Sequence, residues 1–257
     1  MTEKLRSITR TKGPAVLAFA LLIGIWQGVC SLGLVPSFML PSPVDVVKAF
    51  AADFSLLMEN TAVTLQEAFL GLLLGVLLGF FFAVLMDAFA PLRKALYPIL
   101  VVSQTIPTVA IAPLLVLWLG YEMTPKIVLI VLTTFFPVAV GLLEGFASCD
   151  ADCENLLRSM GAGRWKVFYY LKFPSALPQF FSGLRIAAAY SVVGAVISEW
   201  LGGFMGLGVY MTRVKKAFAF DKMFAVILLI SVISLLLMAL VSLLEKVSMP
   251  YRERSKK

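Results

Sequence analysis

The 257-residue chain offers few side chains for acid–base, metal or nucleophilic chemistry. It contains no histidine, so the usual general base and the commonest protein metal ligand are missing. Cys149 and Cys153 are four residues apart, but no further ligand accompanies them, and we expect reduced thiols rather than a zinc site. A Gly-x-x-x-x-Gly-Lys-Ser/Thr phosphate loop is also missing, so the chain cannot hydrolyse ATP alone. The sequence therefore predicts no enzyme, no metal and no cofactor.

Polar groups inside long apolar runs suggest transport chemistry instead. An acidic residue at the centre of a membrane helix costs about 2.5–3.5 kcal/mol, so Glu67 and Glu199 should face other helices or water. Glu199 precedes a glycine-rich turn. It could contact cargo, hold an outer gate or cap the turn, and the sequence leaves these three roles open. The proline-broken run around Pro107 is typical of either a translocation pathway or a kinked structural helix. The candidate pathway residues are Glu67, Ser103, Gln104, Thr105, Pro107, Thr108, Tyr190, Glu199 and Trp200.

The elements that hold these residues are predicted to be membrane helices. The chain is 60% apolar and 14% charged, whereas soluble domains are about 45–50% apolar and about 25% charged. A membrane helix needs about 20 apolar residues, and six runs meet this requirement, at 14–35, 61–89, 95–119, 125–146, 178–201 and 223–247. We therefore expect an all-α membrane protein with a tail at 1–13, one transmembrane domain at 14–250, a loop at 147–177 and a tail at 251–257.

The basic residues predict the orientation of these spans. Cytoplasmic loops are enriched in Lys and Arg, and fifteen of the 22 fall in the tails and alternate loops on the N-terminal side. Six fall on the other side (Lys48, Lys126, Arg213, Lys215, Lys216 and Lys222), and Arg185 lies inside a span near its cytoplasmic end. Both termini are therefore expected in the cytoplasm. The scattered cations do not form the single basic face that a nucleic-acid partner would need.

Two loops carry further structural signals. In the outer loop at 36–60, Val46, Val47 and Phe50 follow two prolines at helical spacing, which suits either a short helix on the membrane surface or an ordinary connector. In the cytoplasmic loop, a short helix at 152–160 is followed by a turn at Gly161 and Gly163. A second short helix at 164–171 should end at Pro174. Apolar and aromatic residues beside cations suit this helix-turn-helix to a partner protein.

At this loop the chain resembles the transmembrane permease subunits of binding-protein-dependent ABC importers. Their loop has Glu-Ala-Ala, three residues, Gly, nine residues, then Ile-x-Leu-Pro. Here nine residues separate Gly161 from Leu171-Lys172-Phe173-Pro174, while Asn155, Leu156 and Leu157 replace Glu-Ala-Ala and Glu154 is displaced by one residue. The resemblance continues through Leu40-Pro41-Ser42-Pro43, the run from Ile106 to Leu114, Phe135-Phe136-Pro137 and Gly206-Leu207-Gly208.

The resemblance implies the type I ABC importer permease fold and a set of partners. These are cytoplasmic ABC ATPase subunits, an external substrate-binding protein, a second copy of the chain in a homodimer, and membrane lipid. The implied ATPase-coupling residues are Glu154, Asn155, Leu156, Leu157, Arg158, Gly161, Gly163, Arg164, Leu171, Phe173 and Pro174. The rival reading, an ion-coupled secondary transporter, should show repeated halves and more intramembrane acidic residues or histidines.

The cargo is the finest prediction from the resemblance. The subgroup imports nitrate, sulfonates, taurine, bicarbonate and pyrimidine precursors of thiamine, and the stretch from Phe180 to Trp200 looks most like the permeases for hydroxymethylpyrimidine-like precursors. An aromatic heterocycle suits Tyr190, Trp200 and the polar patch at 103–108, because it needs stacking faces and a few hydrogen bonds. Sulfonate, taurine or nitrate remains the alternative cargo, although an anion would favour more interior cations than Arg185.

Overall fold

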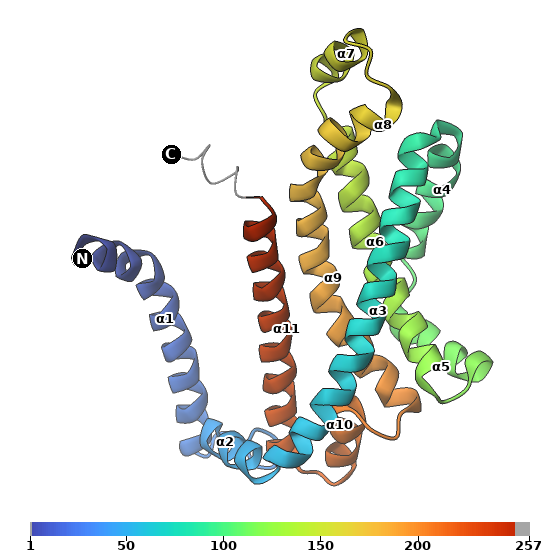
Figure 1. Ribbon diagram of the computed structural model, residues 1–257. Coiled ribbons are helices and arrows are strands. Elements are labelled where there is room, and N and C mark those ends of the chain that lie inside the picture. Colours follow the sequence, from blue (N-terminus) through green and yellow to red (C-terminus); the bar gives the residue numbers. More distant parts are fainter. Residues whose placement is uncertain (1, 250–257) are drawn as a thin grey trace. The chain divides into compact units, whose positions relative to one another are not determined.

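The computed structural model describes the backbone of residues 2–249 and the side chains of 13–14 and 16–249. These residues form helices joined by short turns, with no strand among them, which confirms the expected all-α class (Figure 1). The helices are α1 (Thr2–Ser31), α2 (Pro43–Ala52), α3 (Phe54–Ala88), α4 (Ala90–Ser103), α5 (Thr108–Leu119), α6 (Met123–Ala147), α7 (Ala151–Ser159), α8 (Arg164–Val167), the π-helical turn η1 (Phe168–Lys172), α9 (Phe173–Gly202), α10 (Leu207–Lys216) and α11 (Phe220–Ser248).

Four of the expected spans appear as helices long and apolar enough to cross a membrane. They are α3, α6, the continuous helix Arg164–Gly202, and α11. The expected span at 95–119 is instead the pair α4 and α5, which are bent by 99° at the break before Pro107 and make a fifth crossing if they count as one span. The apolar part of the first expected span is the shorter helix Val16–Ser31. Six spans are therefore more than helix length alone supports in residues 2–249.

One helix boundary differs from the prediction. Residues 2–13 are helical, as the first part of α1, which is compatible with the predicted tail at 1–13, and the expected C-terminal tail at 251–257 lies outside the described residues. Pro174 does not end the second loop helix, because α8, η1 and α9 are continuous. Proline removes one helical donor and crowds the preceding turn, but η1 widens that turn and Phe173 N–H bonds to Phe168 O instead. The second helix of the predicted loop at 147–177 is therefore the first part of the continuous helix Arg164–Gly202.

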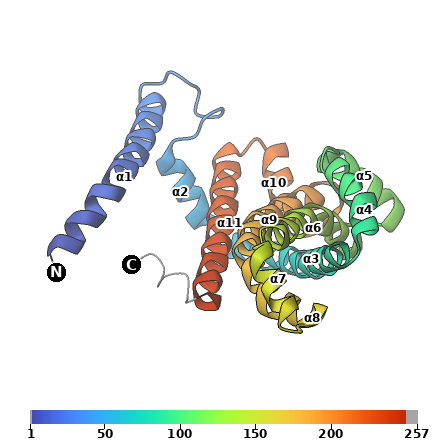
Figure 2. The same ribbon diagram turned by 90° about the horizontal axis from the view of Figure 1, so that it is seen from above.

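One compact unit comprises Glu59–Val209 and Ile230–Lys257 of the chain. Within it α6 and α9 lie side by side, as Figures 1 and 2 show. Glycines at every fourth position of α3 let it pack closely against α6, since a Cβ at Gly71 or Gly75 would overlap Ile130 or Thr134. Further along α6, a Cβ at Gly145 would meet Ala176 of α9. These close approaches bury the core around Met86, Val138 and Leu142.

The second compact unit comprises Met1–Met58 and Tyr210–Leu229. The predicted helix after the two prolines is α2, and its N-cap Ser42 accepts the N–H of Asp45. At the other end of α2, Asp53 accepts hydrogen bonds from Lys222 Nζ at 2.7 Å and from Tyr210 Oη at 2.5 Å. The Lys222 bond and then the Tyr210 bond hold the pKa of Asp53 below its ordinary value. This three-residue cluster joins α2, α10 and the start of α11.

Candidate functional site

The turn between α7 and α8 has the backbone that the sequence predicted. Gly161 lies at φ +83°, a left-handed conformation in which any Cβ is strained. The turn follows the end of α7, where Gly161 N–H bonds to Arg158 O and Ala162 N–H bonds to Leu157 O, and α8 begins after Gly163. The two short helices project beyond the ends of α6 and α9 (Figure 1). A side chain larger than hydrogen at position 161 would therefore strain the turn that orients them.

Salt bridges anchor this loop to the helices beneath it. Glu154 accepts a hydrogen bond from Arg158 at 2.6 Å, and Lys172 bridges it at 3.9 Å. Lys172 also pairs with Asp87 at the end of α3, at 3.2 Å. The Arg158 bond, supported by the charge of Lys172, holds the pKa of Glu154 below its ordinary value. Glu154 therefore links α7 to Lys172, and its carboxylate is already occupied within the chain.

The loop exposes an apolar and basic surface. Trp165 is 80% exposed, Met160 75% and Leu156 62%, while Asn155, Arg164 and Lys166 lie exposed among them. The remaining loop candidates Leu157, Leu171, Phe173 and Pro174 are half-buried. Phe168, which directly follows α8, packs its ring against Phe146, with the ring centroids 5.5 Å apart. We name the exposed set of Leu156, Met160, Arg164, Trp165 and Lys166 the loop surface, and its composition suits a protein partner.

Glu67 and Glu199 are both buried inside the helical unit. Glu67 bonds to Lys126 Nζ at 2.5 Å, with side-chain exposures of 4% and 7%. Glu199 accepts the hydroxyl of Thr64 at 2.7 Å and the N–H of Gly208 at 2.6 Å. The first turn of α10 has no intrahelical partners for its N–H groups, and Glu199 supplies one of the missing acceptors. Each glutamate has internal partners, so both side chains hold helices together in this structure.

Side chains of α3 complete this buried cluster. Asn60 Oδ1 accepts Gly206 N–H at 2.8 Å, and Thr64 Oγ1 accepts Leu207 N–H at 2.9 Å. Because Asn60, Thr64 and Glu67 are spaced by four and three residues, they lie on one face of α3. We name Asn60, Thr64, Glu67, Lys126 and Glu199 the buried polar cluster. It ties α3, α6 and α9 to the glycine-rich segment before α10.

Lys126 is the member that the sequence did not reveal. The prediction counted it as an exposed cation of an outer loop, but it is 6% exposed in the first turns of α6. Its partner Glu67 is 59 residues away, and no local pattern joins the two. Arg185 is likewise paired, with Glu245 of α11 at 2.7 Å. Lys126 and Arg185 are thus both paired with carboxylates.

The other pathway candidates, apart from the half-buried Thr108, lie at exposed positions. Ser103 is the last residue of α4, Gln104 and Thr105 follow it in the break before α5, and Pro107 precedes the first turn of α5. Ser103 and Thr105 donate their hydroxyls to the carbonyls of Leu100 and Val102, at 2.7 and 2.8 Å. Tyr190 is 52% exposed and Trp200 43%. These residues are therefore separate from the buried polar cluster and are available to a neighbouring molecule.

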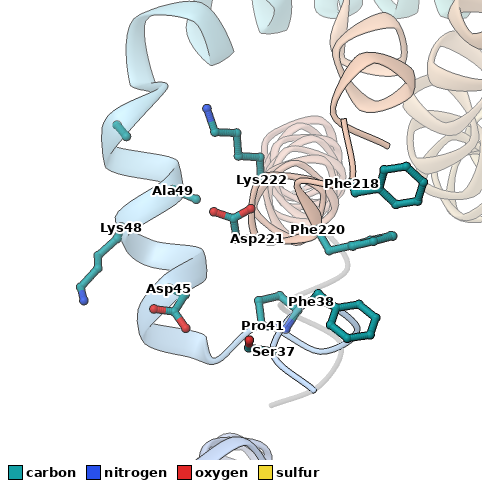
Figure 3. A pocket seen from close by; sticks show the side chains of 11 residues that line it. Ser37, Phe38, Pro41, Asp45, Lys48, Ala49, Phe218, Phe220, Asp221 and Lys222 are labelled. Atoms are coloured by element: carbon teal, nitrogen blue, oxygen red, sulfur yellow. The ribbon is translucent and has the colours of Figure 1, made fainter. Parts of the chain in front are cut away.

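A pocket of about 480 Å³ opens beside α2 (Figure 3). Phe38, Phe218 and Phe220 line one side of it, and Asp45 and Asp221 bring carboxylates from α2 and from the start of α11. Phe218 is 77% exposed and has a positive φ of 57°, which is uncommon outside glycine. Sequence reasoning missed this pocket because its walls come from segments more than 150 residues apart in the chain. Lys48 and Lys222 also line the pocket, so it offers both cations and carboxylates beside its aromatic rings.

Comparison with known proteins gives a consistent result. The family model described as "Binding-protein-dependent transport system inner membrane component" matches residues 72–247. The formylaminopyrimidine transport permease protein ThiX of Halalkalibacterium halodurans is 37% identical over 239 residues, 93% of this chain and 95% of that protein. The taurine transport system permease protein TauC of Escherichia coli is 32% identical, over 85% and 82%.

A solved structure supports the fold independently. The structure titled as inward-facing conformations of the MetNI methionine ABC transporter matches with a TM-score of 0.67 at 18% identity, over 76% of this chain and 96% of that chain. At this identity the match concerns the arrangement of helices alone.

Proposed function

The chain belongs to the binding-protein-dependent transport inner membrane components, a family of ABC importer permease subunits rather than enzymes, and we propose that it forms the translocation pathway of one such importer. In this proposal two copies pair in a bacterial inner membrane, six spans per copy place both termini in the cytoplasm, and a separate ATPase supplies energy. The observation that carries the proposal is the pairing of a helical, apolar unit with an exposed two-helix loop at one end.

The loop surface is the proposed ATPase contact. Trp165, Met160 and Leu156 present apolar area, and Arg164 and Lys166 add charge complementarity toward an acidic groove. When the ATPase subunits close around ATP, movement of α7 passes through Glu154, Lys172 and Asp87 to the end of α3, because salt bridges join these residues. The spans then rock between inward-open and outward-open states.

A glycine substitution tests this coupling. Gly161→Val strains the turn and should reorient α8, so the ATPase should copurify poorly and transport should be lost, while the protein inserts normally. Gly13→Val is the matched control, because a Cβ meets nothing within 4 Å at either glycine, but only Gly161 of the two has a positive φ. If Gly161→Val transported at the wild-type rate, the loop would not be the element that couples the ATPase to transport.

Cysteine labelling tests the orientation. The excess of basic residues on one side predicts that Lys166 faces the cytoplasm and Lys216 faces outward. In intact cells a membrane-impermeant thiol reagent should label Lys216→Cys and miss Lys166→Cys, both in a background without the native cysteines. The reverse pattern would invert the proposed topology.

The pocket beside α2 is the proposed contact for the external binding protein. Its carboxylates, Asp45 and Asp221, would pair with Lys or Arg of that protein while Phe218 and Phe38 pack against apolar side chains. Asp45→Asn with Asp221→Asn should weaken binding-protein association and leave ATPase copurification intact. Unchanged association of the double variant would exclude this surface.

The proposed cargo is a thiamine-precursor pyrimidine. Identity of 37% to a permease named for formylaminopyrimidine favours it, and the exposed aromatic rings of Tyr190 and Trp200 suit a heterocycle. A strain that requires the precursor should grow on low hydroxymethylpyrimidine or formylaminopyrimidine only when this gene is present.

A sulfonate is the second candidate cargo, favoured by the 32% identity to a taurine permease. Against it, the basic residues Lys126 and Arg185 are already paired with carboxylates. Gene-dependent growth on taurine or a sulfonate as sulfur source, with none on the pyrimidine, would replace the first cargo by the second.

A further inference from the structure

Helix α4 has an unusual position among the apolar helices. None of its described residues is buried, although it is 14 residues long and largely apolar. Beside it lies a groove of about 300 Å³ between α3, α4 and α6, lined by Leu78, Phe82, Leu96, Leu100, Val131 and Phe135 among others. Leu78 and Ile99 at its rim are 42% and 62% exposed. An apolar groove that opens at the surface of a membrane protein needs an apolar occupant.

The polar end of α4 indicates the charge of the molecule that would occupy the groove. Arg93 and Lys94 are exposed, and neither forms a salt bridge among the described residues. Arg93, Leu96 and Leu100 are spaced by three and four residues, so the guanidinium lies on the same face as the leucines of the groove. Seven residues of helix place Leu100 about 10 Å deeper than Arg93. Tyr97, an aromatic residue of the kind enriched at membrane interfaces, lies between them.

We propose that the α3–α4–α6 groove binds one acyl chain of an anionic phospholipid, whose phosphate pairs with Arg93 and Lys94. Charge, interfacial aromatic ring and apolar groove follow each other along α4 in the same order as headgroup, interface and acyl chain in a lipid. Basic residues beside spans on the cytoplasmic side recognise anionic headgroups in this way. The lipid would support α4, which otherwise has no buried residue, and so hold the break before Pro107 in place.

A second copy of this chain fits the groove less well. Two copies related by a twofold axis present the same patch to each other. An interface centred on this part of α4 would bring Arg93 and Lys94 of one copy close to the same cations of the other, with no acidic residue of α4 to offset them. Like charges held together in an apolar setting are unfavourable, whereas a phosphate neutralises them.

Lipid titration tests the proposal on the full chain in complex with its ATPase. The complex is delipidated in detergent, titrated with phosphatidylglycerol or phosphatidylcholine, and the bound lipid is counted by native mass spectrometry. Wild type should bind phosphatidylglycerol more tightly than phosphatidylcholine. Loss of two cations at about 1 kcal/mol each should weaken phosphatidylglycerol binding about 30-fold in Arg93→Gln/Lys94→Gln. Leu100→Trp fills the groove and should also abolish tight binding.

Matched variants keep the test specific. Lys215→Gln/Lys216→Gln removes two exposed cations of α10, and Leu117→Trp enlarges an exposed residue of α5 outside the groove; both should bind lipid as wild type does. Equal affinity of Arg93→Gln/Lys94→Gln and wild type would overturn the proposal. The proposal would also be overturned if Leu100→Trp separated two copies of the chain but left lipid binding unchanged, because a second copy would then be the occupant of the groove.

The cytoplasmic placement of Arg93 rests on the proposed orientation, but this readout in detergent depends on neither orientation nor cargo. Failure of the cargo or labelling experiments therefore leaves the lipid result standing, and the reverse also holds.

Discussion

Lys126 is the residue whose removal should damage the folded protein most. Its ammonium pairs with Glu67 at 2.5 Å, both side chains are less than a tenth exposed, and the second carboxylate oxygen of Glu67 is buried without a hydrogen-bond donor. Lys126→Met keeps the length and apolar stem of the side chain but leaves the Glu67 carboxylate in the core with no cation. Breaking a buried pair from one side costs about 3–5 kcal/mol, because an uncompensated charge remains.

The assay is thermal unfolding of the purified chain in detergent, followed by the fraction that stays monodisperse after heating. A domain of this size loses about 2–4 °C of Tm per kcal/mol, so Lys126→Met should melt about 6–20 °C below wild type. The double variant Lys126→Met/Glu67→Gln removes both charges and should recover more than half of that loss, since replacing both partners is often nearly neutral. The part of the Tm that the double variant recovers measures the cost of the unpaired charge, and the part that it does not recover measures the loss of packing.

Lys222→Met is the control. Lys222 also pairs with a carboxylate, that of Asp53, but it is about a third exposed, and exposed pairs contribute about 0–1 kcal/mol. Its Tm should change by at most a few degrees. If Lys126→Met melts within 2 °C of wild type, or if the double variant is no more stable than the single one, the buried polar cluster does not hold the helices together as argued.

Three further predictions concern individual residues. Gly206→Ala should destabilise the chain by about 2 kcal/mol or more, because φ there is +122° and the new Cβ would overlap the Glu199 carboxylate. The control Gly33→Ala, at φ +68° in open space, should cost only about 1–2 kcal/mol. Equal melting temperatures of the two variants would contradict this prediction. Because the pKa of Asp53 is lowered in the folded state, its contribution to stability is complete at pH 7 and is lost as the pH falls from the ordinary pKa of 3.8 through the folded-state pKa. The difference in Tm between wild type and Asp53→Asn should therefore close at acid pH, and a constant difference would contradict this. Burial, and then the charge of Glu154, raises the pKa of Cys149. In Cys30→Ser protein at pH 8, Cys149 should therefore react with iodoacetamide more slowly than the exposed Cys153, and a faster reaction of Cys149 would refute its partial burial.

Local sequence patterns predicted the long helices well. The apolar runs at 61–89, 125–146 and 223–247 lie within a few residues of α3, α6 and α11, except that α3 begins earlier, at Phe54. The break at Pro107 and the positive φ of Gly161 were also predictable, because proline and glycine restrict or free the backbone wherever they occur. Pro174 misled the prediction because a π-helical turn, which has no simple sequence signal, absorbed it.

The site was predictable only where it is local. The two-helix loop occupies one continuous stretch, so spacing alone revealed its turn and most of its exposed residues. The buried polar cluster depends on residues separated by up to 146 positions, such as Asn60 and Gly206, and on Lys126, which looks like a loop cation in the sequence. Only the packing of α3, α6 and α9 brings these groups together.

Reconstituted transport tests the central claim most directly. The chain, its ATPase and the external binding protein are placed in liposomes, and uptake of radiolabelled formylaminopyrimidine is followed with ATP on the ATPase side. The account predicts uptake that requires all three proteins and ATP hydrolysis, and that Gly161→Val abolishes. Uptake that persists without the ATPase, driven by an ion gradient, would contradict it.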